Sequence, residues 1–538
     1  MSNKSKGNLL PEQVQAEYRQ AVDYKRQLGS RGLYEQTRIN ERFFSGDQWY
    51  GVNCGDNRPL VRYNVIKRIG DYKMAVVGAQ PVSVRFSAEG VPVTAASQQL
   101  VEGYRGALRQ GQTPDALPAD AAAQAMAQAL TDYFDTTARR LKFEELKQRV
   151  LRNAYISGTG VLYTYWDDRI RTGLYADLAR TAPICGDIVT EVLDVEQVYM
   201  GDPSVEDIQQ QPYILIAQRR GVGEIQRLAK ANGCRRWAEI RGDEGSGSGH
   251  ATLITRFWKE WSDDGNAVVR AAQICGDVMV REPWDMGVKL YPLSVFRWEE
   301  KRHQCYGESE IPNLIPNQIA INRTISAGVW AVMMMGMPMM LVNGDVVSGP
   351  ITNDPGQIIP VYGSGEEVKD AVRYVDPPAF SAQLDQNVQG LIRDTMAQAG
   401  VSTTLLGDIE PHNTSAIIAV REASLMPLTM MQNRFYSFIE DVAHVWAEFW
   451  MAMYGNRGLK IAEEQGTWYM PFDGETCRDL LLSIRAEVGS GDTYSDSRTV
   501  EVLDNLYSHG IINAKQYLSR LPRGIVPRMD ALLQEMVV

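Results

Sequence analysis

Apolar residues in the first part of the chain recur at helical spacing. In residues 1–45 they follow one another every three or four positions, and two glycines divide the stretch, so a second helix is expected over Leu33–Phe44. The same spacing predicts a helix over Val61–Val77, and Pro81–Phe86 has the pattern of a short strand. An alanine-rich run predicts one long helix over Pro118–Ile156, because alanine has the highest helix propensity.

The pattern changes to that of β-strands between Gly158 and Phe296. Polar and apolar residues alternate there, or form short apolar runs rich in valine, isoleucine, tyrosine and tryptophan, which favour strands. Glu224–Ala231 has helical spacing and is expected to form a short helix between strands. The strands are expected in GVLYTYWDD, DIVTEVLDVEQVYMG, YILIAQRRG, LITRFWKEW, VVRAAQICGDVMVREP and YPLSVFRWEE.

A helical rod is expected after Tyr306. Pro316 can occupy its first turn, where the missing N–H of proline costs nothing. At 1.5 Å per residue the rod, residues 316–337, is about 30 Å long, and it should end near Gly336–Pro338. The residues expected on one face of this helix are Ile319, Asn322, Ile325, Val329 and Val332.

A second rod helix is expected over residues 382–399. Ser381 is a suitable N-terminal cap, and Gly400 is a suitable C-terminal stop. The intervening residues 341–380 are rich in glycine and proline and contain short strand-like pieces, which predicts a small compact module. The apolar face of the second helix is expected to consist of Leu384, Val388, Leu391, Ile392 and Met396.

Residues 401–414 are expected to form a loop, and a long helix over Ser415–Tyr454 follows it. Pro427 is expected to kink this helix. Two further strands, in TWYMPF and LLLSIRAEVG, precede a helical tail over residues 492–538. Together these elements predict an α+β protein. The apolar stripe of the long helix is expected at Ile417, Val420, Leu425, Met431, Phe435, Phe438, Val442, Val445, Phe449 and Met453.

The charge balance argues against a protein that holds nucleic acid tightly. The chain has 538 residues, with 55 lysine and arginine residues against 66 aspartate and glutamate residues, and a net charge of −11. Tight binding to duplex DNA uses the opposite sign, because each basic contact with a phosphate adds affinity by releasing counterions. An acidic chain can still have DNA as a partner, provided that it does not bind the DNA tightly.

Cysteine use and the N-terminal sequence indicate a reducing compartment. The six cysteines form no CxxC pair, and the first thirty residues are polar and mixed in charge, unlike a secretory signal peptide. The uncharged stretch between Arg323 and Asp345 contains GVWAVMMMGMPMMLV, but Gly336 and Pro338 interrupt it and no basic cluster flanks it. A helix buried against other helices, or against copies of itself, is expected there rather than a membrane span.

The sequence lacks the motifs of the common enzyme classes. It contains no GxxxxGK[ST] phosphate loop, GxSxG elbow or HExxH zinc motif, and the stretch Gly221–Gln226 lacks the third glycine of a dinucleotide fingerprint. No catalytic residue, cofactor or metal is therefore expected. The five histidines are scattered, whereas metal ligands would be clustered: His250, His303, His412, His444 and His509.

The order of the expected elements resembles that of the portal proteins of tailed bacteriophages. In that family a mixed helix-and-strand wing leads to a stem helix, a small clip, a returning stem helix, a tunnel loop, a long wing helix and a helical crown. The likeness extends over nearly the whole chain. The stretches that carry it are RFFSGDQW, RPLVRYNVIKRIGDYKMAVVGAQP, YPLSVFRWEEKRHQCYGESEIPNLIPNQIAINRTIS, AGVSTTLLGDIEPHNTSAIIAVREASLMPL and HGIINAKQYLSRLPRG.

The resemblance implies a division of the chain into portal regions. Residues 1–306 would form the N-terminal helices and wing, and residues 307–340 the stem helix. The methionine-rich end of that helix, Val332–Met340, is unusual for a tunnel wall and would face either the channel or a neighbouring subunit. The clip, returning stem helix, tunnel loop, long helix with the remaining wing, and crown would be residues 341–380, 381–400, 401–414, 415–490 and 491–538.

The resemblance also implies a function. Portal proteins form dodecameric rings at one capsid vertex of the virion, are assembled in the host cytoplasm, and pass double-stranded DNA without sequence specificity during packaging and ejection. Their partners are the terminase large subunit, adaptor and tail proteins, and the major capsid and scaffolding proteins, with no membrane involved. The implied DNA-facing residues of the tunnel loop are Asp408, Glu410, His412 and Asn413. The implied subunit contacts of the stem are Ile319, Ile325, Val329, Val332, Leu384, Val388 and Leu391.

Two other interpretations stay open at the level of sequence. A different head–tail connector or adaptor would also be a structural protein of the virion, but adaptors are normally much shorter and lack a helix–clip–helix core. An enzyme of unrecognised mechanism would show hydrolase activity with Mg²⁺ or Mn²⁺.

Overall fold

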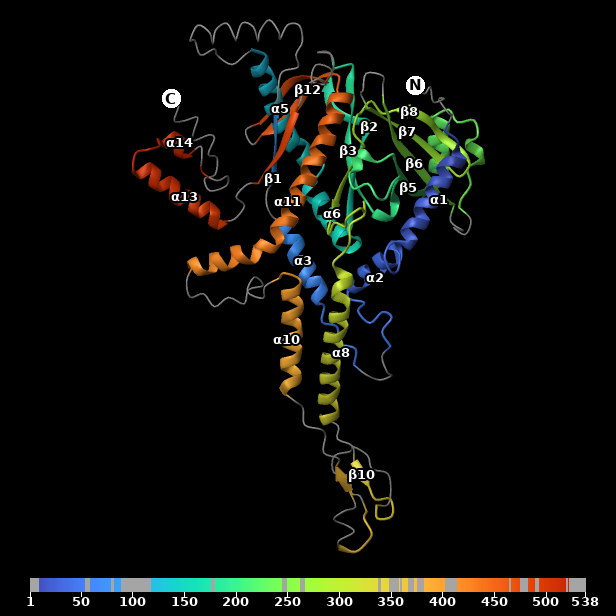
Figure 1. Cartoon of the computed structure of the whole chain (residues 1–538), viewed down its shortest axis with the longest axis vertical. Helices are drawn as coiled ribbons and strands as arrows, with labels where there is room; N and C mark the ends of the chain where they lie inside the picture. The colour runs from blue at the N-terminus through green and yellow to red at the C-terminus, as the bar shows by residue number, and fades with distance from the viewer. Residues whose placement is uncertain are drawn as a thin grey trace. The chain divides into compact units, whose positions relative to one another are not determined.

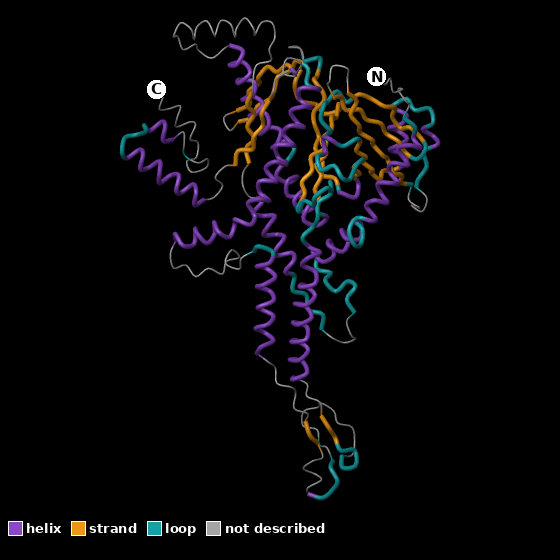
Figure 2. Tube along the Cα trace, in the orientation of Figure 1, coloured by secondary structure: helices purple, strands orange, loops and turns teal. Residues whose placement is uncertain are grey.

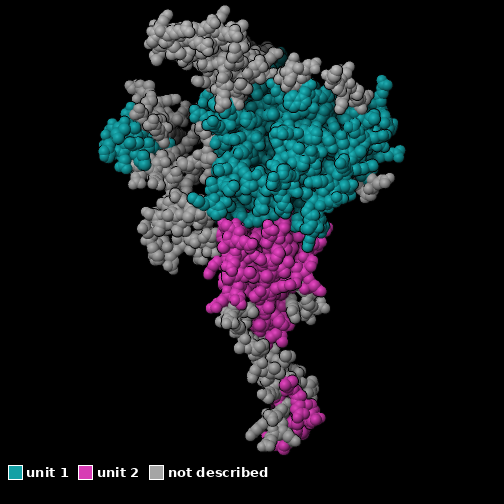
Figure 3. Space-filling model, in the orientation of Figure 1, with its two compact units in different colours: residues 1–37, 72–310, 425–538 teal, residues 38–71, 311–424 magenta. Residues whose placement is uncertain are grey.

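The computed structural model is mixed α and β, as the sequence pattern predicts. The chain divides into two compact units (Figure 3): unit 1 comprises Met1–Thr37, Tyr72–Glu310 and Leu425–Val538, and unit 2 comprises Arg38–Asp71 and Ile311–Ser424. The residues that the structure describes are 9–53, 59–78, 82–88, 118–175, 180–243, 249–261, 267–336, 340–347, 358, 360–365, 372–374, 382–401, 414–463, 466–474, 482–488, 493–518 and 521.

The N-terminal elements agree with the predicted pattern. Gly29 and Gly32 adopt φ values of 72° and 79°, a left-handed conformation that glycine reaches without a steric penalty, and they separate the first two helices. The helix predicted before these glycines and the helices predicted at Leu33–Phe44 and Val61–Val77 are therefore confirmed to within a few residues. The elements are α1 (Pro11–Gln27), α2 (Leu33–Ser45), α3 (Val65–Gly78) and β1 (Val82–Ala88).

The prediction of one continuous helix over Pro118–Ile156 is wrong. The structure has two helices, α5 (Pro118–Arg140) and α6 (Phe143–Ser157). Lys142 lies between them with a φ of 52°, which places it in the left-handed region and turns the chain. Helix propensity is high on both sides of this point, so propensity alone gives no signal for the break.

The region predicted as β folds into two antiparallel sheets of unit 1. One has the strand order β3-β2-β9 and the other the order β4-β5-β6-β7-β8. The predicted short helix is present as α7 (Val222–Ala231), between β5 and β6. The strands are β2 (Thr159–Tyr175), β3 (Pro183–Leu193), β4 (Val198–Met200), β5 (Tyr213–Gly221), β6 (His250–Trp261), β7 (Ala267–Cys275), β8 (Val278–Asp285) and β9 (Leu293–Arg297). Short 3₁₀ helices occur at Val195–Gln197, Ile208–Gln210 and Trp237–Glu239.

The five-stranded sheet is covered on both faces. Successive residues of a strand point to opposite faces, and Leu253 and Ile254 of β6 belong to different apolar clusters. Leu253 packs in the cluster that contains Ile225 of α7, whereas Ile254 packs in the cluster that contains Val14 of α1. Burial on both faces explains why these strands read as apolar runs rather than as a strict alternation.

Helix α11 (Thr414–Met453) supplies much of the aromatic core of unit 1 from Leu425 onwards. Trp446 is fully buried, and its ring centroid lies 5.0 Å from that of Phe134 in α5 and 5.3 Å from that of Phe143 in α6. Trp446 therefore packs against both helices, on either side of the break between α5 and α6. The part of the predicted apolar stripe that is confirmed as buried comprises Met431, Phe435, Phe438, Val442, Val445 and Phe449.

The C-terminal part of the chain contains one strand more than predicted. β12 (Asn456–Glu463) pairs with β13 (Gly466–Asp473), and β14 (Leu482–Val488) pairs with β1. The missed strand carries Arg457, Lys460 and Glu463, which hide its apolar alternation, and its backbone hydrogen bonds come from β13. Helices α13 (Thr493–Ser508) and α14 (Ala514–Leu518) confirm a helical tail, and its predicted last stretch, PRMDALLQEM, lies outside the described residues.

Unit 2 contains the two predicted rod helices, α8 (Ile311–Gly336) and α10 (Ala382–Gln398). The placement of Pro316 in a first turn is wrong, because α8 begins five residues earlier and Pro312 occupies that turn. Between the rods in sequence, β10 (Met340–Val342) pairs with β11 (Val372–Tyr374).

Candidate functional site

The two rod helices of unit 2 lie side by side (Figures 1 and 2). The Nδ2 atom of Asn317, near the start of α8, donates a hydrogen bond of 3.3 Å to Oε1 of Gln398, at the end of α10. The helices are therefore antiparallel, and residues 337–381 join the end of one to the start of the other. We refer to α8 and α10 as the rod-helix pair and treat it as the candidate functional site.

The apolar face of α10 is confirmed in its second half. Val388, Ile392 and Met396 recur at intervals of four residues and are all buried, as a helix that packs through one stripe requires. Leu391 is half-buried at the edge of this stripe. The side chain of Leu384 lies outside the described residues, so its predicted role stays a prediction.

The end of α10 is also as predicted. Gly400 has a φ of 71°, and the amide of Val401 donates a hydrogen bond of 2.9 Å to the carbonyl oxygen of Met396. A left-handed glycine followed by this backward hydrogen bond closes a helix, because it satisfies carbonyl groups that the helix itself leaves unpaired.

The buried face of the first half of α8 carries polar residues beside the buried Ile311, Leu314 and Ile321. Gln318, Asn322 and Ser326 are spaced four residues apart and are all buried. Sequence periodicity placed Asn322 on the same face as isoleucines and valines, but it lies with these polar residues. Three polar side chains on one buried helix face need specific partners, because an unpaired polar group in a protein interior costs about 1–3 kcal/mol.

Their partners are backbone groups of the segment 59–66, which belongs to the same unit. The Oε1 atom of Gln318 accepts hydrogen bonds from the amides of Val65 (2.9 Å) and Ile66 (3.2 Å). Asn322 Oδ1 accepts from the amide of Tyr63 at 2.9 Å. We call these contacts the amide clamp; Ser326 completes it by accepting a hydrogen bond from the amide of Val61 at 3.0 Å.

The second half of α8 leaves apolar side chains exposed. Val329, Val332 and Met333 are 38%, 56% and 48% exposed, respectively. Ile319 and Ile325, which were predicted to contact a neighbouring subunit, are half-buried within the single chain. The subunit-contact role of all these residues stays a prediction, and the exposure of the valines leaves them accessible to a partner.

The predicted tunnel loop falls almost wholly outside the described residues. All four of its predicted DNA-facing residues lie outside the described part of the chain: Asp408, Glu410, His412 and Asn413. Of the predicted clip, the described parts are residues 341–347, 358, 360–365 and 372–374, in which Val346 and Val347 form a small buried cluster.

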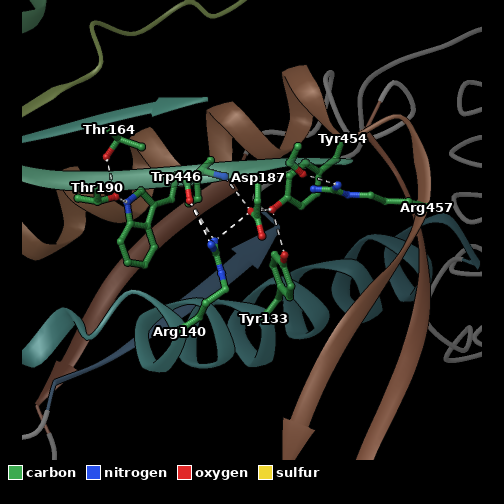
Figure 4. Close-up of polar contacts among 10 residues, drawn as sticks. Tyr133, Arg140, Thr164, Asp187, Thr190, Trp446, Tyr454 and Arg457 are labelled. Carbon is green, nitrogen blue, oxygen red and sulfur yellow. Dashed lines mark hydrogen bonds and ion pairs between the residues drawn. The ribbon is translucent and has the colours of Figure 1, made fainter. Parts of the chain in front are cut away.

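Unit 1 contains a buried polar network that the sequence analysis did not find. Figure 4 shows Arg140 and Tyr454 converging on the carboxylate of Asp187, in β3. Arg140 Nη2 lies 3.0 Å from Asp187 Oδ1, and the hydroxyl of Tyr454 donates to the same oxygen. Tyr133 lies 3.0 Å from the Tyr454 hydroxyl, and Arg457 donates from Nη1 to the carbonyl oxygen of Gly186 at 3.1 Å.

Burial keeps the tyrosines of this network neutral. It raises the pKa of Tyr454 well above the ordinary tyrosine value and raises that of Tyr133 too, and in both cases a nearby negative group adds to the effect. Beside the network, Trp446 Nε1 donates to Thr190 Oγ1 at 3.2 Å, and Thr164 lies 3.2 Å from the same hydroxyl (Figure 4). No sequence motif predicts these contacts, because the partners are 26 to 321 residues apart.

The described residues contain no group of three or more histidine, cysteine, aspartate or glutamate side chains that could hold a metal ion. Where the structure describes them, the cysteines Cys185, Cys234, Cys275 and Cys305 are free thiols. Among the helices that the structure describes, none has the length and apolar character that crossing a bilayer requires.

Comparison with protein-family models gives no match, and comparison with curated proteins gives none either.

Proposed function

We propose that this chain is the portal protein of a tailed bacteriophage, a subunit of the ring through which DNA enters and leaves the capsid. The observation that carries the proposal is the rod-helix pair: two antiparallel helices that are joined through a small two-stranded insert, with apolar side chains exposed on the first helix. This is the order stem, clip and returning stem that the sequence resemblance implies.

The exposed apolar residues support assembly. Val329, Val332 and Met333 lie within five residues on α8, in a stretch without any charged side chain. Contiguous apolar surface of this kind is a liability on a monomer, and contact with neighbouring copies removes it. A closed ring would bury the patch on every subunit, because a cyclic arrangement leaves no free interface.

The charge of the chain suits a conduit. A net charge of −11 gives the chain little attraction for a phosphate backbone, whereas a basic lining would hold DNA by releasing counterions. In this proposal residues 401–414 face the channel, with Asp408 and Glu410 repelling the backbone. The segment 341–380 contacts terminase during packaging and adaptor proteins afterwards.

Negative-stain electron microscopy of the purified full-length chain, with its mass measured in parallel, tests the proposal. Rings with a central hole and about twelvefold symmetry are expected. A chain that stays monomeric at high concentration, both alone and together with the capsid and scaffolding proteins of its own genome, would contradict the proposal.

Lysine substitution in the loop tests the DNA-facing assignment separately. Asp408→Lys combined with Glu410→Lys is expected to slow or stall packaging in an in vitro packaging assay, because the added positive charges attract the phosphate backbone. Packaging at the wild-type rate by rings that carry both substitutions would refute the loop assignment and leave the ring proposal intact.

A further inference from the structure

A cavity of about 140 Å³ lies beside the Asp187 network in unit 1. Its wall is built from three separate parts of the chain: α5, the middle of the β2–β3 hairpin, and the start of β12. The volume is several times the roughly 30 Å³ that a water molecule takes in the liquid. The polar and charged side chains in the wall are Tyr133, Thr136, Thr137, Arg140, Arg171, Thr172, Asp187 and Arg457.

Two residues that line this cavity each have a hydrogen-bonding atom without a partner among the described residues. They are Oγ1 of Thr137, a residue that is 1% exposed, and Nη2 of Arg457, a residue that is 8% exposed. Nearly all buried polar atoms in proteins are hydrogen-bonded, and an acceptor bound in the cavity would supply the partner that these two residues lack. Both can donate a proton, which points to an acceptor.

The charges in the wall also favour an acceptor with negative charge. Arg140, Arg171 and Arg457 contribute three positive charges, and Asp187 contributes one negative charge. Arg140 pairs with Asp187, and the same carboxylate also acts on the buried Arg457, whose guanidinium lies 3.0 Å from the centroid of the Tyr454 ring, so two arginines share one carboxylate in the wall. A buried charge is stable only when it is compensated, and an anion in the cavity would compensate it.

The β2–β3 ladder is irregular at this cavity. Its register shifts on both sides of the pair formed by Arg171 and Cys185, so that Ile170, Thr172 and Leu174 line the cavity together with Arg171. Bulges of this kind redirect side chains and often occur at binding sites. The three arginines of the wall differ in exposure: Arg171 is exposed, Arg140 is about one-third exposed and Arg457 is buried.

We propose that this cavity binds a small tetrahedral oxyanion of the phosphate or sulfate type. Arg457 and Thr137 donate to it from the buried end, and Arg140 and Arg171 hold it from the exposed end. The donors come from three elements on different sides, which suits the oxygens of a tetrahedral ion better than those of a planar carboxylate. The site belongs to unit 1 alone and would exist whether or not the chain forms a ring.

Calorimetric titration of the full-length chain with inorganic phosphate tests the proposal, with sodium chloride at the same ionic strength as the reference. Saturable binding and a matching rise of Tm are expected, because a ligand that binds only the folded state stabilises it. Sulfate is expected to bind similarly, and acetate, which is planar, is expected to behave like chloride.

Two substitutions remove donors at opposite ends of the cavity. Thr137→Val removes a hydroxyl without a protein partner, so the variant should fold normally and bind phosphate about tenfold more weakly. Thr395→Val is its control, because Thr395 is also buried, lies outside the wall, and has a hydroxyl that donates to the carbonyl oxygen of Leu391. Arg171→Gln should also bind about tenfold more weakly, whereas Arg169→Gln, on the same strand but outside the wall, should bind like the wild type.

Three results would overturn the proposal. The first is a phosphate response no larger than that of chloride. The second is wild-type phosphate affinity in both Thr137→Val and Arg171→Gln. The third is equal affinity for acetate and phosphate, which would show that the cavity does not select a tetrahedral ion.

Discussion

The Nζ atom of Lys73 lies 2.7 Å from Oε1 of Glu310 and 2.8 Å from Oε2, in a buried ion pair within unit 1 between residues 237 positions apart in sequence. Removing one partner leaves the other charge buried and unpaired. Glu310→Gln is therefore expected to lower the free energy of unfolding by about 3–5 kcal/mol. Urea unfolding followed by tryptophan fluorescence measures the change.

The matched comparison is the double variant Lys73→Met with Glu310→Leu. It is expected to recover most of the loss, because an apolar pair leaves no buried charge. The exposed pair Arg236–Glu239 is the control, and Glu239→Gln should leave the unfolding midpoint unchanged. An equal loss in the single and double variants would show that packing, rather than the unpaired charge, dominates at this position.

The amide clamp predicts a local effect in unit 2. Gln318→Leu removes the oxygen that accepts from the amides of Val65 and Ile66, so stability is expected to fall by about 1–3 kcal/mol. Hydrogen exchange at these two amides should become faster. Asn317→Leu is the control, because it removes only the 3.3 Å bond to Gln398. Unchanged exchange in Gln318→Leu would mean that the clamp does not hold this segment.

The exposed side of α8 predicts a defect in assembly without a defect in folding. Val332→Asp places a charge on a side chain that is 56% exposed, so the circular dichroism spectrum of the chain should be unchanged. Its oligomers should dissociate, because burying an unpaired carboxylate between subunits is costly. Asn313→Asp, at an exposed position of the same helix, is expected to assemble normally. Mass photometry distinguishes the two, and wild-type assembly of Val332→Asp would argue against α8 as an interface.

Lys25 predicts a pH dependence of stability. Its Nζ donates to the backbone carbonyls of Val195 and Val198 and lies 3.8 Å from the centroid of the Tyr199 ring. Burial lowers the pKa of Lys25 well below its ordinary value of 10.5, so the unfolded chain binds one proton more than the folded chain between the two pKa values. Stability contributed by this group therefore rises with pH up to about 10.5.

Replacing the lysine isolates this contribution. Lys25→Met should lack the rise in unfolding free energy between neutral pH and about 10.5, whereas Lys230→Met, at an exposed position, should keep it. Urea unfolding at a series of pH values measures both profiles. Parallel profiles for Lys25→Met and the wild type would mean that Lys25 keeps its proton inside the folded chain.

Thiol reactivity should follow burial. Burial raises the pKa of Cys305 to about 12 and that of Cys275 to about 11, and the thiolate is the reactive form. Both thiols are expected to resist a maleimide at mildly alkaline pH until the chain unfolds, while the exposed Cys185 reacts at once. Peptide mass spectrometry after brief alkylation measures the order. Modification of Cys305 as fast as Cys185 in the folded protein would contradict its burial.

The amino-acid sequence alone determined the type and approximate limits of most elements. The spacing of Val388, Ile392 and Met396 fixed the buried face of α10, and Gly400 fixed its end. The glycines between α1 and α2 likewise set the boundary between these two helices. These features depend on periodicity and on the conformational freedom of single residues, which are local properties that a sequence displays directly.

The tertiary structure decided everything that depends on partners distant in sequence. The break at Lys142 follows no propensity signal and lies where two phenylalanines pack against Trp446. Asn322 reads as one position of an apolar stripe until the backbone of Tyr63 supplies its partner. Asp187 is an ordinary strand residue until Arg140 and Tyr454 reach it, 47 and 267 residues away. A buried polar group is stable only with a partner, and the fold alone brings that partner within hydrogen-bonding distance.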